Sequence, residues 1–86
     1  MNPQNVRYVF AERLKALRKR AGYTQIDLEA ILHVSKGTVA MWETAKRMPD
    51  IECGIVLARL FHCRLDFLLG VSIIDDYYDY DLEFLM

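Results

Sequence analysis

Residues 24–43, TQIDLEAILHVSKGTVAMWE, predict two short helices joined by a tight connection. Thr24 is a typical helix cap, and Asp27 three residues later completes a capping pattern. The apolar positions of this first helix recur at helical spacing and predict its buried stripe: Leu28, Ile31 and Leu32. We therefore expect the first of the two helices to end near Leu32.

The second helix follows the dipeptide His33-Val34, which forms the expected connection. Ser35 is the predicted cap of a helix over residues 36–43, with Val39 and Trp42 on its buried side. Two short capped helices joined by a few residues make up a helix-turn-helix unit. The sequence therefore predicts this unit in the middle of the chain.

Three further helices are expected around this unit. One begins at Pro3, or alternatively after Asn5, and ends at Ala21 because Gly22 follows it. Its buried stripe is Val6, Phe10, Leu14 and Leu17. A polar segment over residues 44–49 leads to a helix capped by Asp50. The shared face of that helix is Ile51, Ile55, Ala58 and Phe61.

A final short helix over residues 65–69 stops at Gly70. The expected fold class is all-α, a compact five-helix bundle that contains the helix-turn-helix. We expect a domain over residues 1–70 and a separate tail over residues 71–86. Hydrophobic residues make up 53% of the 86 positions, so the domain can form a core without a disulfide scaffold.

The charges divide the chain in the same way. All 11 Lys and Arg residues precede residue 65, and residues 1–72 hold seven acids, which gives this part +4. Residues 73–86 hold five acids and no base, which gives −5. The body therefore suits phosphate groups although the whole chain carries −1. The acidic tail suits a different task.

Several other classes of protein are disfavoured. No signal peptide or membrane span is expected, and the chain is interpreted as cytoplasmic. Cys53 and Cys63 are too few for a disulfide framework, and with His33 and His62 they match no zinc spacing, so no metal or cofactor is expected. Cys53 is interpreted as a small core residue. No nucleophile with a base and no phosphate loop is found, so an enzyme is not expected.

A longer set of residues extends the helix-turn-helix pattern over residues 8–70. The set is Leu14-Lys15-Ala16-Leu17-Arg18, Thr24-Gln25, Leu28, Val34-Ser35, Thr38-Val39, Trp42-Glu43, Leu57-Ala58 and Leu65-Asp66-Phe67-Leu68-Leu69-Gly70. In order and spacing it resembles the Cro and phage-repressor helix-turn-helix family. The resemblance implies that the partner is double-stranded DNA and that the second helix of the unit faces the major groove.

The resemblance also assigns contacts. Gln25 matches a family glutamine that binds phosphate, as a helix N-terminus favours. Lys36 can donate to guanine, and Thr38 can touch a phosphate or a thymine methyl. Met41 offers only apolar contact where relatives often have a polar residue, so Lys36 is the main candidate for base recognition. The expected DNA-contacting residues are Thr24, Gln25, Ser35, Lys36, Gly37, Thr38, Met41, Thr44, Lys46 and Arg47.

Three more expectations follow from the family positions. Gly37 is either a tolerated helix glycine or a point of close approach to DNA. Ala45 replaces a glycine that many relatives have, so its turn either avoids positive φ or accepts strain. Arg18 and Glu43 are expected to form a shielded ion pair, which fixes the recognition helix more than it stabilises the fold.

The tail carries the dimerisation hypothesis. Its apolar residues alternate with acids and predict a strand that pairs with a second subunit: Tyr78, Tyr80, Leu82 and Phe84. A helical stripe competes with this interpretation: Ile73, Ile74, Tyr77, Tyr78, Leu82 and Leu85. A tail that folds back on its own domain, or one that is disordered, also remains open.

The predicted function is a DNA-binding transcription regulator, a repressor that acts as a homodimer on a palindromic operator. Two alternatives come from other classes. One is an antitoxin whose acidic tail neutralises a basic protein partner. The other is an interaction adaptor that has kept the fold without binding DNA.

Overall fold

A computed structural model describes residues 3–70, and within them the chain forms helices and no strand. The helices are α1 (Pro3–Ala21), α2 (Gln25–Leu32), α3 (Thr38–Glu43), α4 (Ile51–Leu60) and α5 (Leu65–Leu68). This confirms the prediction of a compact all-α, five-helix fold. The dimerisation strand predicted for Tyr78, Tyr80, Leu82 and Phe84 lies outside the described residues.

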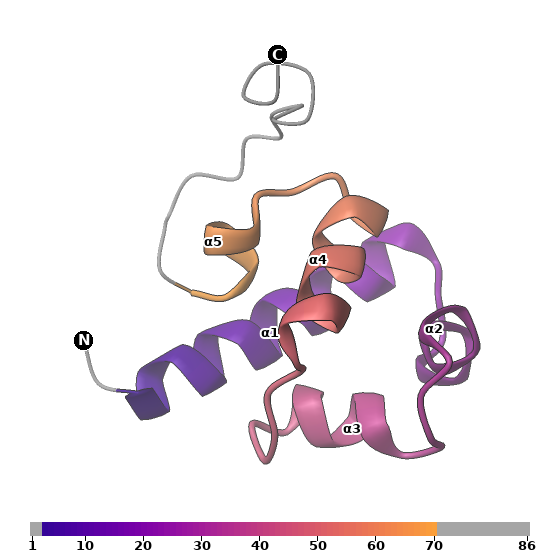
Figure 1. Cartoon of the computed structure of the whole chain (residues 1–86), viewed down its shortest axis with the longest axis horizontal. Coiled ribbons are helices and arrows are strands. Elements are labelled where there is room, and N and C mark those ends of the chain that lie inside the picture. Colours follow the sequence, from indigo (N-terminus) through magenta and orange to yellow (C-terminus); the bar gives the residue numbers. More distant parts are fainter. Residues whose placement is uncertain (1–2, 71–86) are drawn as a thin grey trace.

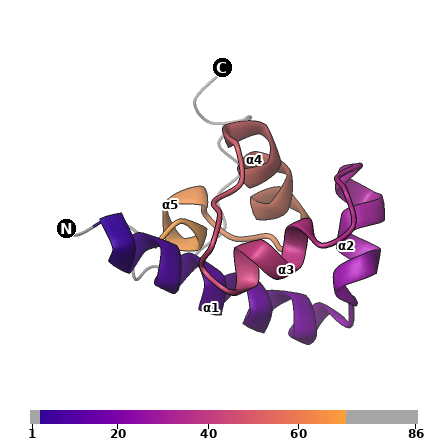
Figure 2. The ribbon, with the colours of Figure 1, turned by 90° about the horizontal axis from the view of Figure 1, so that it is seen from below.

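The long helix α1 organises the bundle. Helices α3 and α5 pack on opposite sides of it (Figure 1), and α2 packs on α3 (Figure 2). All five helices contribute to the most deeply buried side chains: Phe10, Leu14, Leu28, Val39, Leu57 and Leu68. Trp42, only 3% exposed, adds the largest ring of the core. The core therefore fixes α3 by its Val39 and Trp42 side.

The side chain of Arg13 ties α5 to the middle of α1. Its Nη1 donates a hydrogen bond to the carbonyl oxygen of Phe67. Its guanidinium carbon also lies 4.1 Å from the centre of the Phe67 ring, which is a cation–π contact. The last helix is therefore held by polar and aromatic contacts in addition to the burial of Leu68.

Three apolar residues predicted to be buried are exposed. Ile31 on α2 is 41% exposed, and Ile51 and Ile55 on α4 are 77% and 38% exposed. Ala58 and Phe61 are buried as predicted, and Gly54 and Leu57 complete the buried side of α4 in place of Ile51 and Ile55. In helices this short, several apolar stripes fit the same sequence. Packing against the neighbouring helices, α3 for α2 and α5 for α4, selects the one that faces inward.

The start of α3 also differs from the prediction. Ser35 does not cap the helix with its side chain; its carbonyl oxygen accepts the Thr38 N–H at 3.1 Å, which closes a turn. The helix begins at Thr38, and Gly37 precedes it with φ of +90°. Gly37 is therefore not a tolerated helix glycine. It occupies a left-handed conformation that other residues adopt only with strain.

Ala45 adopts a left-handed conformation as well, with φ of +61°. The turn after α3 therefore accepts strain, which was one of the two outcomes expected for alanine here. Replacing Ala45 with glycine is expected to raise the free energy of unfolding by about 0.5–1 kcal/mol, because relief of the strain exceeds the entropy that glycine adds to the unfolded chain. Urea denaturation of the two proteins measures the difference. An unchanged or lower stability would show that the turn is not strained.

Candidate nucleic-acid interface

Four of the predicted contacts lie in α3 and in the turn before it. Lys36, Gly37 and Met41 are exposed, and Thr38 is half-buried. The sequence had predicted that Lys36 and Gly37 lie within the helix, but they lie in the turn before α3. The Lys36 side chain therefore leaves the backbone from a turn, and its direction depends on how that turn is held.

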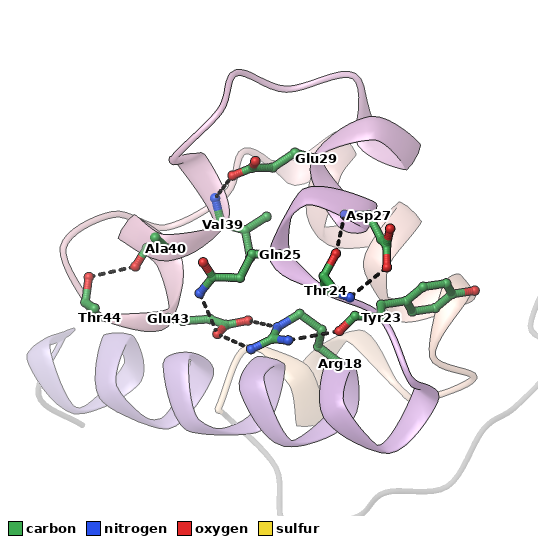
Figure 3. A network of polar contacts seen from close by, with 10 residues as sticks. All are labelled: Arg18, Tyr23, Thr24, Gln25, Asp27, Glu29, Val39, Ala40, Glu43 and Thr44. Carbon is green, nitrogen blue, oxygen red and sulfur yellow. Dashed lines mark hydrogen bonds and ion pairs between the residues drawn. The ribbon is translucent and has the colours of Figure 1, made fainter.

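Thr24 begins α2 with the predicted capping box. Its Oγ1 accepts the Asp27 N–H at 3.0 Å, and its own N–H donates to Asp27 Oδ2 at 2.8 Å. The bond from the Thr24 N–H, together with the Thr24 hydroxyl, lowers the pKa of the Asp27 carboxyl. Both groups of Thr24 are thus engaged in fixing the N-terminus of α2, beside Gln25 (Figure 3).

Gln25 is half-buried and its amide turns toward α3. Its Nε2 donates to Glu43 Oε1 at 3.2 Å (Figure 3). A side-chain amide carries two N–H groups, so one bond to Glu43 leaves the other for a phosphate oxygen. The geometry is compatible with the predicted phosphate contact, and Glu43 orients the group that would make it.

Arg18 and Glu43 form an ion pair between α1 and the last residue of α3. Arg18 Nε lies 2.6 Å from Glu43 Oε2, and Arg18 Nη2 lies 3.0 Å from Glu43 Oε1. The ion pair is therefore bidentate. The side chains are only 11% and 3% exposed. Hydrogen bonding to Glu43 raises the pKa of Arg18. Arg18 Nη1 also donates to the Tyr23 carbonyl at 2.9 Å, so the pair connects α1, α3 and the segment before α2.

The loop after α3 supplies the basic residues Lys46 and Arg47, both exposed. Thr44 is exposed too, but its hydroxyl donates to the Ala40 carbonyl at 2.8 Å and is thus engaged within α3. A groove of about 510 Å³ beside α3 brings Ser35, Thr38 and Arg47 together. The groove therefore joins one predicted contact from the loop after α3 with two from the turn and start of α3.

The start of α4 forms the far wall of this groove. Asp50 caps α4 by accepting the Cys53 N–H at 2.8 Å, and this bond lowers the pKa of the Asp50 carboxyl. Burial raises the pKa of the Cys53 thiol. A thiol with a raised pKa holds little thiolate at neutral pH, which makes it a poor nucleophile. In the described part of the chain no disulfide joins Cys53 and Cys63.

A family model described as helix-turn-helix matches residues 14–68, which include α2, α3 and the turn between them. The chain belongs to the helix-turn-helix family of the Cro and phage-repressor type. Within this helix-turn-helix fold, α3 occupies the place of the recognition helix, and α2 is the helix that supports it.

Two curated relatives belong to Bacillus subtilis (strain 168). The chain is 34% identical over 59 residues to the HTH-type transcriptional regulator ImmR, a match that covers 69% of this chain and 46% of ImmR. It is 27% identical over 64 residues to the uncharacterized HTH-type transcriptional regulator YobD, covering 74% of this chain and 57% of YobD. The chain thus spans about half the length of these relatives. No solved structure matches the chain.

Sequence reasoning missed one residue of this helix-turn-helix. Glu29 on α2 is only 7% exposed, and its Oε2 accepts N–H groups from both Gly37 and Val39. A glutamate in a short helix normally faces solvent, so its type gave no sign of this role. The available signal was its place one residue after Leu28, which was predicted to be buried.

Proposed function

We propose that this chain binds double-stranded DNA as a transcription regulator. The proposed surface consists of α3 with the turn before it, the start of α2, and the loop over residues 44–49. The observation that carries the proposal is that α3, with the turn before it, has a buried side and an exposed side. Val39 and Trp42 are buried and Glu43 is paired with Arg18, while Lys36 and Met41 are exposed. Because the buried side of α3 is fixed against the core, its exposed side can face a major groove.

The charges support the same proposal. Lys46 and Arg47 are exposed after α3, where phosphates beside a groove would lie, and Lys36 is exposed before α3, where it could donate to a base. Gln25 can add an amide N–H to one of these phosphates. The match to the helix-turn-helix family, and the names of two relatives called transcriptional regulators, also support the proposal.

We further propose that the regulator works in the cytoplasm as a homodimeric repressor on a palindromic operator. One recognition helix of six residues covers few base pairs, which limits the specificity of a single subunit. Two copies on a two-fold axis would place their recognition helices about 34 Å apart, one turn of DNA. Bound to such a site, the dimer would block polymerase.

None of the helices within residues 3–70 has the length and apolar character of a membrane span.

Salt dependence tests the proposed function. A dimer that neutralises about six phosphates is expected to give a slope near −5 when the logarithm of the binding constant is plotted against that of the salt concentration. The measurement is fluorescence anisotropy with random duplex DNA between 50 and 200 mM salt. A slope near zero, or no binding at low salt, would reject DNA binding and favour the adaptor alternative.

Removal of the tail tests the proposed dimer. We expect a chain that ends at Ser72 to be monomeric, because it lacks the alternating residues proposed to pair across the two-fold axis: Tyr78, Tyr80, Leu82 and Phe84. Sedimentation at micromolar concentration measures its mass, and an operator-binding assay measures the loss of affinity. If the shortened chain stays dimeric and keeps its affinity, another surface forms the dimer.

The acidic tail favours a second candidate function. Five acids without a base in residues 73–86 suit a basic protein, as in an antitoxin that covers its toxin. The operon and the purified complex distinguish the two functions. A small basic protein that is encoded beside this chain and co-purifies with the full chain, but not with one ending at Ser72, would support the antitoxin function.

A further inference from the structure

The carboxylate of Glu29 lies at the point where the turn of the helix-turn-helix enters α3. Its Oε2 accepts the Gly37 N–H at 2.8 Å and the Val39 N–H at 3.2 Å. The contact to Val39 links α2 with α3 in Figure 3. One buried oxygen atom thus holds the backbone on both sides of Thr38.

The same residue also holds the start of the turn. The main-chain carbonyl of Glu29 accepts the Val34 N–H at 3.1 Å, which closes the end of α2. The side chain and the main chain of Glu29 therefore bind opposite ends of the segment between the helices. Within residues 3–70, Glu29 supplies the side-chain bonds to the N–H groups of Gly37 and Val39, and Gly37 gives α3 no side-chain cap.

The contacts of Glu29 determine what α3 can offer to DNA. Helix N-termini attract anions through their unpaired N–H groups. Here a carboxylate of the protein already occupies two of these donors, so the recognition helix has less to offer a phosphate through its backbone. Contacts with DNA at this end must come from side chains, chiefly those of Lys36 and Thr38.

The bond between Glu29 and the Gly37 N–H also affects the direction of the Lys36 side chain. Lys36 lies in the turn, and the next residue is a glycine at φ of +90° with no side chain to restrain it. Without the bond to its N–H, Gly37 could rotate, because glycine has many accessible conformations. Any rotation at Gly37 would change the direction in which the Lys36 side chain leaves the backbone relative to α3.

We propose that Glu29 is the positioning residue of the recognition helix. By holding Gly37 and Val39 it fixes the directions of Lys36 and Thr38, and so sets the discrimination between bases. This inference rests on the proposed DNA-binding function. It assigns selectivity to a buried acidic residue that makes no contact with DNA itself.

Alanine and glutamine at position 29 separate geometry from charge. Because a single oxygen accepts both N–H groups, the amide oxygen of Glu29→Gln can keep both bonds, whereas Glu29→Ala removes them. The probes are an operator selected by the parent protein from a random duplex library and a scrambled duplex of equal length. We expect Glu29→Ala to reduce the ratio of the two affinities about 10-fold per half-site, whereas Glu29→Gln stays within about 3-fold of the parent.

A control variant must show whether lower stability of the fold is enough to reduce the ratio of affinities, without any change in the position of the recognition helix. Leu60→Ala provides the control, because Leu60 is a half-buried residue of α4 that packs on the core and is remote in sequence from the turn. It is expected to lower the melting temperature while it keeps the parent's ratio of affinities. The inference is wrong if Glu29→Ala keeps the parent's ratio, or if Leu60→Ala loses as much.

Amide hydrogen exchange gives a readout that needs no DNA. Glu29→Ala should accelerate exchange at Gly37 and Val39 relative to the rest of the core, and Glu29→Gln and Leu60→Ala should not. Unchanged exchange at both amides in Glu29→Ala would overturn the positioning role. Failure of the proposed function would appear instead as a parent protein that shows no salt-dependent binding to DNA.

Discussion

Replacing Glu43 with alanine is expected to lower the free energy of unfolding by about 3 kcal/mol, because it leaves the buried guanidinium of Arg18 without its partner. Arg18→Ala is expected to lower the free energy of unfolding by a similar amount, since the Glu43 side chain is only 3% exposed and would lose both hydrogen bonds from Arg18. Urea denaturation at neutral pH measures both. A loss below about 0.5 kcal/mol in either variant would show that the pair behaves as an exposed surface ion pair.

The double replacement Arg18→Met with Glu43→Leu separates stability from position. Removing both charges avoids an unpaired buried ion, so its stability is expected to return to within about 1 kcal/mol of the parent. Gln25 would then lose its partner Oε1, and the C-terminal end of α3 would lose its link to α1. We therefore expect weaker binding to the operator in a protein that folds. Parent-like affinity in the double variant would reject the positioning role of the pair.

Lys36→Ala is expected to cost about 1–3 kcal/mol per half-site, and about twice that for a dimer on both half-sites. The reason is that Lys36 is the only exposed cation beside the start of α3 among the predicted base contacts. Selection from a random duplex library should show a relaxed preference at one position of each half-site, where the parent selects guanine. An unchanged base preference would mean that Lys36 contacts only phosphate.

Lys46→Ala is the matched control, because it removes one exposed lysine at the other end of α3. It is expected to weaken binding to all duplexes alike and to reduce the salt slope by about one unit per subunit. If both variants lose affinity uniformly for every sequence, base recognition must come from the shape of the DNA and not from Lys36.

Local sequence patterns were enough to predict the helices. The capping box of Thr24 and Asp27 and the cap at Asp50 depend on bonds within one turn, so neighbouring residues determine them. The same holds for the stripe of Phe10, Leu14 and Leu17 in α1, which is long enough for a single stripe to dominate. These patterns, in their order, also identified the helix-turn-helix family.

The short helices were less well determined. A short helix has room for several stripes, and Ile51 and Ile55 are exposed because Gly54 and Leu57 face the core in their place. The start of α3 was predicted two residues too early because Ser35 and Lys36 are compatible with a helix. In the structure the left-handed conformation of Gly37, which a hydrogen bond to Glu29 of α2 holds, makes the helix begin at Thr38.

The sequence by itself determined the helical fold, the caps of α2 and α4 and the place of the recognition helix, because these depend on contacts between residues close in the chain. Only the tertiary structure decided which side chains hold that helix. Glu29 reaches Gly37 and Val39 across 8 and 10 residues, and Gln25 reaches Glu43 across 18. Such partners depend on how α2 packs against α3. A buried carboxylate requires donors, and only the folded chain brings them within bonding distance.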